Sequence, residues 1–376
     1  MKKNIVKEKK IIFSIVSMEK GGAERVVATL ANELCKNNDV SIMTLVHGDF
    51  KYPIDSKVNK ISLATDKKKK NKFFKAVCFP ITFIKRLLKM KKVFKIENPD
   101  IIISFLPETS FLSSFCKNKN SKLIISDRND PKIEYKDFKY KFLMKKLYPC
   151  ADGYVFQTYD AKKYFEDYID FSKKEWNIIF NPVNPIFLNQ THSIKKIKKI
   201  VSVGRLQEQK NQKLLIDAFS LISKKFPEYS LVIYGEGPLR QELEEKIRLL
   251  KLEDKVFLPG AIDNIQDEIK DAKMFVMTSI YEGMPNALIE AMVLGLPVIS
   301  SDCPCGGPKM LIKNGENGYL FESNNLNDLI NKLEMLLNDE KKCQEIGLKA
   351  TDIVNLVSSE KINTEWENII FDVLNK

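Results

Sequence analysis

Short apolar runs alternate with longer amphipathic stretches along most of this 376-residue chain. Ile11–Ser17 and Ile101–Phe105 have the length and character of buried strands, while Ala23–Lys36 places apolar side chains at helical spacing. Strands that alternate with helices in this way build parallel βαβ units. The pattern therefore predicts an α/β protein with parallel sheets.

The same rhythm supplies the other expected elements. Further strands are expected at Val40–Val46, Leu123–Ser126, Tyr154–Phe156, Ile200–Val203, Leu231–Tyr234, Lys255–Leu258, Met274–Thr278 and Pro297–Ser300. Further helices are expected at about 80–97, 108–117, 134–148, 212–225, 238–250 and 285–294.

A polar, basic stretch at 181–199 interrupts the rhythm and begins with two prolines, which is typical of a linker. The chain is also too long for one ordinary core. We expect two Rossmann-like domains, at 1–188 and 195–357, and a helix at about 358–376 that carries Trp366 back to the first domain. Ligands collect beyond the carboxyl ends of strands in open α/β sheets, so the cleft between the two sheets is the expected site.

The positive charge of the chain is concentrated in one segment. The formal net charge is +12, and Lys67–Lys95 contains twelve Lys or Arg residues and no acid, so the rest is formally neutral. Phe73 and Phe74 add aromatic character to its first part. A basic, aromatic stretch suits an anionic membrane surface, and we expect residues 67–83 to contact one.

The second part of the segment has a simpler explanation. Phe83, Leu87, Met90 and Phe94 recur at helical spacing, as in a crossover helix that packs on a sheet. A nucleic-acid-binding protein would explain the charge, but it predicts basic residues spread over a whole binding face. Because the second half is not basic, we expect no nucleic-acid partner.

The compartment follows from apolar runs and cysteines. No uncharged apolar run approaches the roughly 20 residues of a membrane-spanning helix, and Ile11–Val16 is too short for the core of a signal peptide. The seven cysteines show no regular spacing, which favours reduced thiols. We expect a cytoplasmic protein attached peripherally to the inner face of the plasma membrane.

Two glycine-containing loops follow expected strands. Gly21 and Gly22 precede the first helix, whose free amides could receive an anion, although a mere tight turn explains them as well. Gly204, Arg205 and Lys210 follow the first strand of the second half, and the two cations could converge on a diphosphate. By spacing alone they could also be two surface cations. The chain has only six Arg against 55 Lys, which favours a geometric role for each Arg.

The most informative stretch runs from Glu282 to Glu290. Pro285 starts a helix after a glycine-containing loop and leaves the amides of Asn286 and Ala287 without helical partners. Glu290 lies inside an apolar helical run, where a carboxylate is costly to bury without a hydrogen-bond partner, and sugar hydroxyls would be suitable partners. A solvated helix glutamate is the simpler alternative.

Cys303 and Cys305 are close enough to suggest a metal site, but the rest of the chain argues against one. There is no second cysteine pair at zinc spacing, and His47 and His192 are the only histidines. We expect no metal and no cofactor, and the same shortage of histidine disfavours a Ser-His-Asp mechanism.

The Glu282–Glu290 pair, with seven residues between, resembles the EX7E motif of family 4 glycosyltransferases of the GT-B fold. The surrounding Tyr-Glu-Gly-Met-Pro-Asn-Ala-Leu-Ile-Glu-Ala-Met, the later Gly-Gly-Pro and Asn-Gly-Glu-Asn-Gly-Tyr-Leu-Phe, and the early Gly-Gly-Ala-Glu-Arg follow that family. The resemblance implies two Rossmann-like domains that face each other across a cleft. It also implies a retaining, metal-independent hexosyltransferase that uses a nucleotide-sugar donor.

The resemblance implies a role for each residue that matches the motifs of the family. Arg205 and Lys210 would neutralise the leaving diphosphate, Glu282 would hold the hydroxyls of the donor sugar, and Glu290 would bind the ribose. The other donor-binding residues that it implies are Gly21, Gly22, Gly235, Glu236, Met284, Pro285, Asn286 and Ala287. Arg128 stands in a loop where many relatives have a sugar-contacting histidine, and it would bind donor or acceptor phosphate.

The loop around Cys303 is similar to that of bacterial enzymes that build O-antigen, capsule and lipid-linked glycans. The expected reaction is transfer of a hexose or N-acetylhexosamine, favouring GalNAc or Gal, from a UDP-sugar to a polyprenyl-diphosphate-linked acceptor. A non-catalytic UDP-sugar sensor would carry the same motifs.

Overall fold

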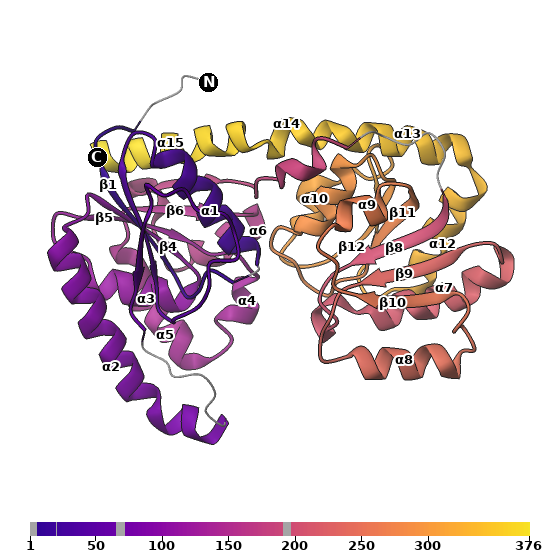
Figure 1. Ribbon diagram of the computed structural model, residues 1–376, viewed down its shortest axis with the longest axis horizontal. Coiled ribbons are helices and arrows are strands. Elements are labelled where there is room, and N and C mark those ends of the chain that lie inside the picture. The colour runs from indigo at the N-terminus through magenta and orange to yellow at the C-terminus, as the bar shows by residue number, and fades with distance from the viewer. Residues whose placement is uncertain (1–5, 20, 65–71, 191–196) are drawn as a thin grey trace. The chain divides into compact units, whose positions relative to one another are not determined.

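The structure, a computed structural model, describes residues 6–19, 21–64, 72–190 and 197–376, without the side chains of 72–81. The described chain divides into two compact units (Figure 1). Unit 1 comprises Met1–Pro182 and Ser359–Lys376, and unit 2 comprises Val183–Ser358. Residues 183–188, expected in the first domain, lie in unit 2, because the amide of Val183 donates to the carbonyl of Val357 (2.9 Å).

Unit 1 is built on one parallel sheet of seven strands in the order β3-β2-β1-β4-β5-β6-β7. The strands are β1 (Lys10–Ile15), β2 (Asp39–Thr44), β3 (Asn59–Ser62), β4 (Ile101–Phe105), β5 (Lys122–Ser126), β6 (Gly153–Phe156) and β7 (Glu175–Ile178). The central strand β4 is buried along its whole length because its side chains are packed on both faces of the sheet.

Helices cover both faces of this sheet, as Figure 1 shows, with α1 and α15 on one side and α2, α3 and α5 on the other. The helices of unit 1 are α1 (Gly22–Leu34), α2 (Lys72–Glu97), α3 (Pro107–Cys116), α4 (Pro131–Glu134), α5 (Phe138–Leu147), α6 (Tyr159–Glu166) and α15 (Ser359–Asn375). From the last of these, Trp366 enters the core and stacks on Phe105 with ring centroids 5.8 Å apart.

The single helix expected at 134–148 is wrong, because the chain forms α4 and α5 with a break between them. The Asp137 carboxylate accepts a hydrogen bond from the amide of Lys139 (2.8 Å) and so caps the start of α5. Just before it, the hydroxyl of the buried Tyr135 donates to Asp127 (2.6 Å), which fixes the turn. A side-chain cap within an apparently continuous pattern thus starts a new helix.

The crossover helix α2 is longer than the expected 80–97. Met90 and Phe94 are buried, and Arg86, itself buried, forms an ion pair with Glu108 of α3. Residues 67–71 of the basic segment lie outside the described residues, as do the side chains of 72–81. Among the helices that are described, none is long and apolar enough to cross a lipid bilayer.

Unit 2 repeats the architecture with six parallel strands in the order β10-β9-β8-β11-β12-β13. Its strands are β8 (Ile197–Val203), β9 (Ser230–Tyr234), β10 (Val256–Gly260), β11 (Ala272–Met277), β12 (Val298–Asp302) and β13 (Tyr319–Glu322). Its helices are α7 (Gln212–Lys225), α8 (Arg240–Leu249), α9 (Ile265–Ile269), α10 (Asn286–Val293), α11 (Gly307–Leu311), α12 (Leu326–Asn338), α13 (Glu340–Ala350) and α14 (Val354–Val357). Residues 197–199, expected in the linker, therefore belong to β8.

Candidate functional site

The strand order of unit 2 reverses between β8 and β11. From β8 the chain continues outward to β9 and β10, whereas β11 continues in the opposite direction to β12 and β13. Such a switch point leaves a crevice beyond the carboxyl ends of the two central strands, where ligands bind in open α/β sheets. The loop after β8 carries Arg205 and Lys210, and the loop after β11 carries Glu282.

Lys210 and Glu282 form an ion pair at this switch point. The Glu282 side chain is 8% exposed and the Lys210 side chain 21% exposed, so the carboxylate lies beneath an ammonium group that still reaches solvent. A buried carboxylate needs such a partner, because desolvation is costly without one. An ammonium has three N–H donors, so the pair leaves Lys210 with donors for a further anion.

Three further hydrogen bonds hold the two loops together. The Thr278 hydroxyl donates to the carbonyls of Lys210 (3.0 Å) and Asn211 (2.9 Å), and the amide of Ile280 donates to the carbonyl of Gln209 (2.8 Å). These hydrogen bonds to backbone carbonyls hold the two loops together, so the position of the pair does not depend on its own ionic attraction alone. Thr278 was not among the residues predicted from the sequence, because its only signal is a hydroxyl at the end of an apolar strand.

The loop after β9 packs against the loop after β8 without space for side chains. Gly235 has φ +141°, and a Cβ at that position would come within 2.0 Å of the carbonyl oxygen of Gly204. The amide of Gly204 donates to the carbonyl of Tyr234 (2.9 Å), and the amide of Leu206 donates to the carbonyl of Glu236 (3.0 Å). Glycine at 235 is therefore required by both conformation and space.

Glu236 does not present a free carboxylate. Its two oxygens accept hydrogen bonds from Nη2 (2.6 Å) and Nε (2.9 Å) of Arg240, a two-pronged contact that lowers the pKa of Glu236. Arg205, in contrast, is exposed, and no residue described in unit 2 forms an ion pair with its guanidinium.

The loop that contains Glu282 is also fixed by the loop after β12. The amide of Glu282 donates to the carbonyl of Pro304 (2.6 Å), and the amide of Cys305 donates back to the carbonyl of Glu282 (3.1 Å). A Cβ on Gly307 would come within 1.7 Å of the carbonyl oxygen of Gly283, so this glycine permits the close approach.

Cys303 and Cys305 are not joined in a disulfide, and both are buried in this loop. Burial raises the pKa of Cys303 to about 12, so the thiol stays protonated and is a poor metal ligand or nucleophile. Across the described residues, no three or more His, Cys, Asp and Glu side chains gather as a metal-binding group.

The helix α10 starts at Asn286, directly after Pro285. The amides of its first turn have no partner within the helix, and a helix N-terminus attracts anions. Asn286 and Ala287 are partly exposed there, whereas Met284 and Pro285 are buried. Further along the same helix, Glu290 is half-buried among buried apolar neighbours.

In unit 1, Gly21 lies directly before α1, and Gly22 is the first residue of that helix. The Tyr52 hydroxyl donates to the carbonyl of Gly21 (2.8 Å) and accepts from its amide (3.3 Å). The Glu24 carboxylate lies against Gly21, where a Cβ would come within 2.2 Å of Oε2, and burial raises the pKa of Glu24. The Glu24 carboxylate therefore lies beside the start of α1, where the sequence predicted that the free amides could receive an anion.

Arg128 is held in unit 1 by side chains that are distant from it along the chain. Its guanidinium lies over the rings of Phe105 (5.1 Å) and Trp366 (5.5 Å) and donates to the side-chain oxygen of Asn181 (3.2 Å). Burial lowers the pKa of Arg128 to about 9. No signal in one sequence connects Trp366 with Arg128, because they are far apart along the chain.

Asp127, next to Arg128, is buried with two tyrosines. The Tyr135 hydroxyl donates to Oδ2 (2.6 Å) and the Tyr148 hydroxyl to Oδ1 (3.1 Å) of its carboxylate. Burial nevertheless raises the pKa of Asp127 to about 7.

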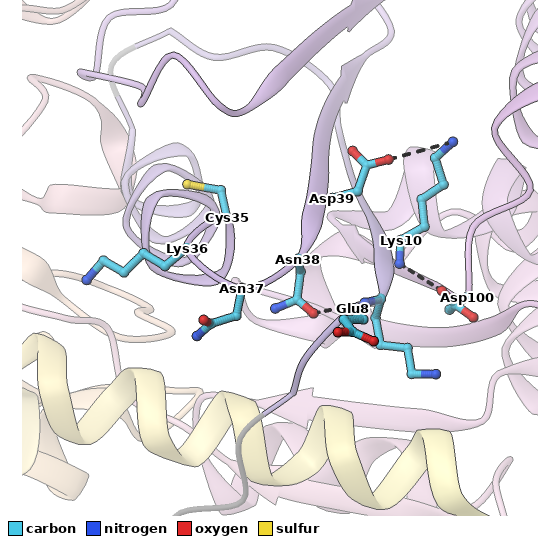
Figure 2. Close-up of a pocket in the computed structure, with 9 residues that line it drawn as sticks. Glu8, Lys10, Cys35, Lys36, Asn37, Asn38, Asp39 and Asp100 are labelled. Atoms are coloured by element: carbon cyan, nitrogen blue, oxygen red, sulfur yellow. Dashed lines mark hydrogen bonds and ion pairs between the residues drawn. The ribbon is translucent and has the colours of Figure 1, made fainter.

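A hollow at the opposite, amino end of the unit 1 sheet contains none of the expected site residues. Figure 2 shows its lining, in which Lys10 pairs with Asp39 and its amide donates to Asp100 (2.7 Å). Because Lys10, Asp39 and Asp100 already interact with one another, and because ligands of such sheets bind at the carboxyl ends, we assign no ligand to this hollow.

Comparison with known proteins identifies the family. A family model described as glycosyl transferases group 1 matches residues 185–352. An α-1,4-N-acetyl-D-galactosaminyltransferase of Campylobacter jejuni, which acts on a GalNAc-GalNAc-diNAcBac-PP-undecaprenol substrate, is 31% identical over 375 residues, covering 97% of this chain and 99% of that protein. The chain belongs to the group 1 glycosyl transferases.

Two further similarities support the assignment of this group 1 glycosyltransferase. A second Campylobacter jejuni enzyme, a 4-α-N-acetylgalactosaminyltransferase that acts on a diphospho-undecaprenol-linked substrate, is 30% identical over 88% of this chain and 91% of its own. The structure of Anabaena HepE in complex with UDP matches with a TM-score of 0.81 at 18% identity, covering 96% of this chain and 100% of that one. This structural likeness confirms the expected GT-B fold class.

Proposed function

We propose that this glycosyltransferase moves a hexose or N-acetylhexosamine from a UDP-sugar to a polyprenyl-diphosphate-linked glycan, with retention of anomeric configuration. The observation that carries the proposal is the Lys210–Glu282 ion pair at the switch point of unit 2, where the loop that holds Lys210 also carries the exposed Arg205. The arrangement supplies cations for a leaving diphosphate and a carboxylate for sugar hydroxyls.

In the reaction, the bond between the anomeric carbon of the sugar and the oxygen of the β-phosphate breaks, and the acceptor hydroxyl oxygen bonds to that carbon. The acceptor proton passes to the leaving diphosphate, so the charges balance. Negative charge grows on the diphosphate in the transition state, where the Lys210 ammonium and the Arg205 guanidinium stabilise it. Because these two groups are fixed cations, the proposal requires no metal.

Glu282 has two roles in this proposal. Its carboxylate holds Lys210 in position, and its remaining oxygen lone pairs accept hydrogen bonds from hydroxyls of the donor sugar. The amides at the start of α10 receive phosphate oxygens, and Glu290 binds the ribose of the nucleotide. Retention, metal independence and membership of family 4 follow the EX7E resemblance.

The relatives support the choice of sugar and acceptor. Two of them transfer N-acetylgalactosamine to undecaprenyl-diphosphate-linked glycans, and a Salmonella typhimurium lipopolysaccharide 1,6-galactosyltransferase is 31% identical over 46% of this chain. We therefore favour GalNAc or Gal as the transferred sugar, in the assembly of a surface glycan. With such an acceptor, we propose that the enzyme works at the inner face of the membrane and that residues 67–83 form a basic contact with it.

A two-step experiment tests the proposal. UDP, UDP-GalNAc, UDP-Gal and GDP-sugars are first compared as stabilisers against thermal unfolding, and the UDP compounds should raise the melting temperature most. The donor that binds is then incubated with a polyprenyl-diphosphate-GalNAc acceptor, and the anomeric configuration of the product is determined by NMR.

The Glu282→Ala variant tests the role of Glu282 in transfer. It should lose transfer by about 100-fold or more while it remains folded. Transfer at near-normal rate by this variant would refute the role of Glu282. Binding of a UDP-sugar by the wild type without turnover of any acceptor would instead point to a non-catalytic sensor.

A further inference from the structure

The outward face of α5 carries two exposed phenylalanine rings. Phe138 is 81% exposed and Phe142, one helical turn later, is 51% exposed. The opposite face attaches the helix to unit 1, since Met144 is buried and Tyr140 packs edge-on against Phe111 with ring centroids 5.6 Å apart. The two rings are therefore left outward by a helix that is already packed.

Lysines flank these rings on both sides. At roughly 3.6 residues per turn, Lys139 and Lys146 lie on one side of the Phe138–Phe142 line, and Lys141 and Lys145 lie on the other. The helix contains no acidic residue. The Lys145 ammonium lies over the ring of Tyr168, 4.8 Å from its centroid. This pattern of apolar rings between cations is typical of a helix that lies in a membrane interface.

The neighbouring helix α2 shows the same pattern on the same side of the sheet. Ile84 is 55% exposed and Leu88, one turn later, is 60% exposed, and the exposed Lys85 and Lys92 lie beside them. Helix α3 packs against both α2 and α5, as Figure 1 shows, so the three helices form one continuous side of unit 1.

We propose that the α5 face, defined by Phe138 and Phe142 with their four flanking lysines, docks on an anionic lipid bilayer. The rings enter the boundary between headgroups and acyl chains, and the lysines face the lipid phosphates. Charge complementarity identifies the occupant, because the helix offers cations in two rows and apolar rings between them. The docking face is separate from residues 67–83, and its link to a lipid-borne acceptor rests on the proposed function.

The test uses the full chain and sedimentation with vesicles of phosphatidylglycerol and phosphatidylcholine in equal parts. The double variant Phe138→Ser/Phe142→Ser should bind these vesicles about tenfold or more weakly than the wild type, because two rings no longer leave water. The variant Lys139→Ser/Lys146→Ser should weaken binding most at low salt, because added salt screens exposed charges.

Two control variants remove exposed apolar side chains or exposed lysines from unit 2 instead of from α5. Leu249→Ser/Leu348→Ser replaces two side chains of unit 2 that are 77% and 73% exposed, and Lys224→Ser/Lys349→Ser removes two exposed unit 2 lysines. Both controls should bind vesicles like the wild type. Unchanged binding by the Phe138→Ser/Phe142→Ser variant, or equal binding of the wild type to pure phosphatidylcholine, would overturn the proposal.

A second measurement separates this proposal from the proposed function. Turnover is followed with a short, water-soluble acceptor and with a vesicle-borne acceptor. The Phe138→Ser/Phe142→Ser variant should keep its rate on the soluble acceptor and lose rate only on vesicles. If the wild type turned over neither acceptor, the proposed function would fail, while the vesicle-binding result would still decide the docking face.

Discussion

At the scale of single residues, the ion pair between Lys210 and Glu282 explains why both residues lie where they do. The sequence alone presented them as members of separate loops, 72 positions apart. The chain has 55 lysines, and the order of the strands decides which of them pairs with a given glutamate. Local sequence patterns do not show strand order. The candidate residues could therefore be named from the sequence, but their contact could not.

The variant Lys210→Met should be both inactive and less stable. It leaves the Glu282 carboxylate buried without its partner, which should lower the free energy of unfolding by about 2 kcal/mol, less than for a fully buried pair because Lys210 is partly exposed. The double variant Lys210→Met/Glu282→Gln should recover most of that stability but no activity. Urea unfolding and a transfer assay measure the two effects, and a double variant as unstable as the single one would contradict this account.

Asp127 should make the stability of unit 1 depend on pH. Burial raises its folded pKa to about 7, above the value of about 4 in the unfolded chain. Between these values the folded protein holds a proton that the unfolded chain has released, so the free energy of unfolding falls as the pH rises from about 4 to about 7.

The neutral variant Asp127→Asn should lack this contribution. Its stability relative to the wild type should therefore rise with pH over the same interval and then level off. Urea unfolding of both proteins at several pH values checks this expectation, and parallel stability curves between about pH 4 and 7 would show that folding does not raise the pKa of Asp127.

At the scale of elements, the sequence predicted the interior strands better than the edges. Strands such as β4 and β11 are buried along their whole length and therefore appear as continuous apolar runs. The strands β3, β7 and β13 were missed, and each lies at the edge of its sheet, where about half or fewer of its residues are buried. A short strand that is exposed on one side has no distinctive apolar pattern.

Two glycine variants test the contact between the loops after β8 and β9. Gly235→Ala should lower the melting temperature by about 5 °C or more, because the new Cβ meets the carbonyl of Gly204 and the backbone has a positive φ. Gly204→Ala should leave it nearly unchanged, because its Cβ would meet carbon atoms of Lys210 at an ordinary 3.5 Å.

The affinity of the two glycine variants for UDP gives a second measurement. If Gly204→Ala kept its melting temperature but lost affinity for UDP, the nucleotide would lie against the backbone of that loop. Equal stability of the two variants would contradict the packing described for the loops after β8 and β9.

At the scale of the whole molecule, the chain makes two similar α/β units and then returns to the first. The helix α15 contributes Trp366 and Ile370, both fully buried, to the core of unit 1. The sequence predicted a returning helix, but it could not show that Trp366 would stack on Phe105 and support Arg128, because those contacts join distant parts of the chain.

The variant Trp366→Ala should destabilise unit 1 by about 3–5 kcal/mol, the usual cost of removing a large buried aromatic side chain. Amide hydrogen exchange should rise in peptides from β4, β5 and α15. Peptides from β8 and β11 should exchange at the wild-type rate, since those strands belong to unit 2, and a uniform rise would contradict independent cores.

The return of α15 has a consequence for synthesis on the ribosome. Most of unit 1 is translated before unit 2, yet part of its core consists of residues 359–376, which emerge after unit 2. Domains usually complete their folding in the order of their synthesis. Here we expect unit 2 to resist protease in nascent chains that end at Ser358, while unit 1 is still cleaved; protection of both would disprove it. The part of the enzyme that is made first would then be finished last.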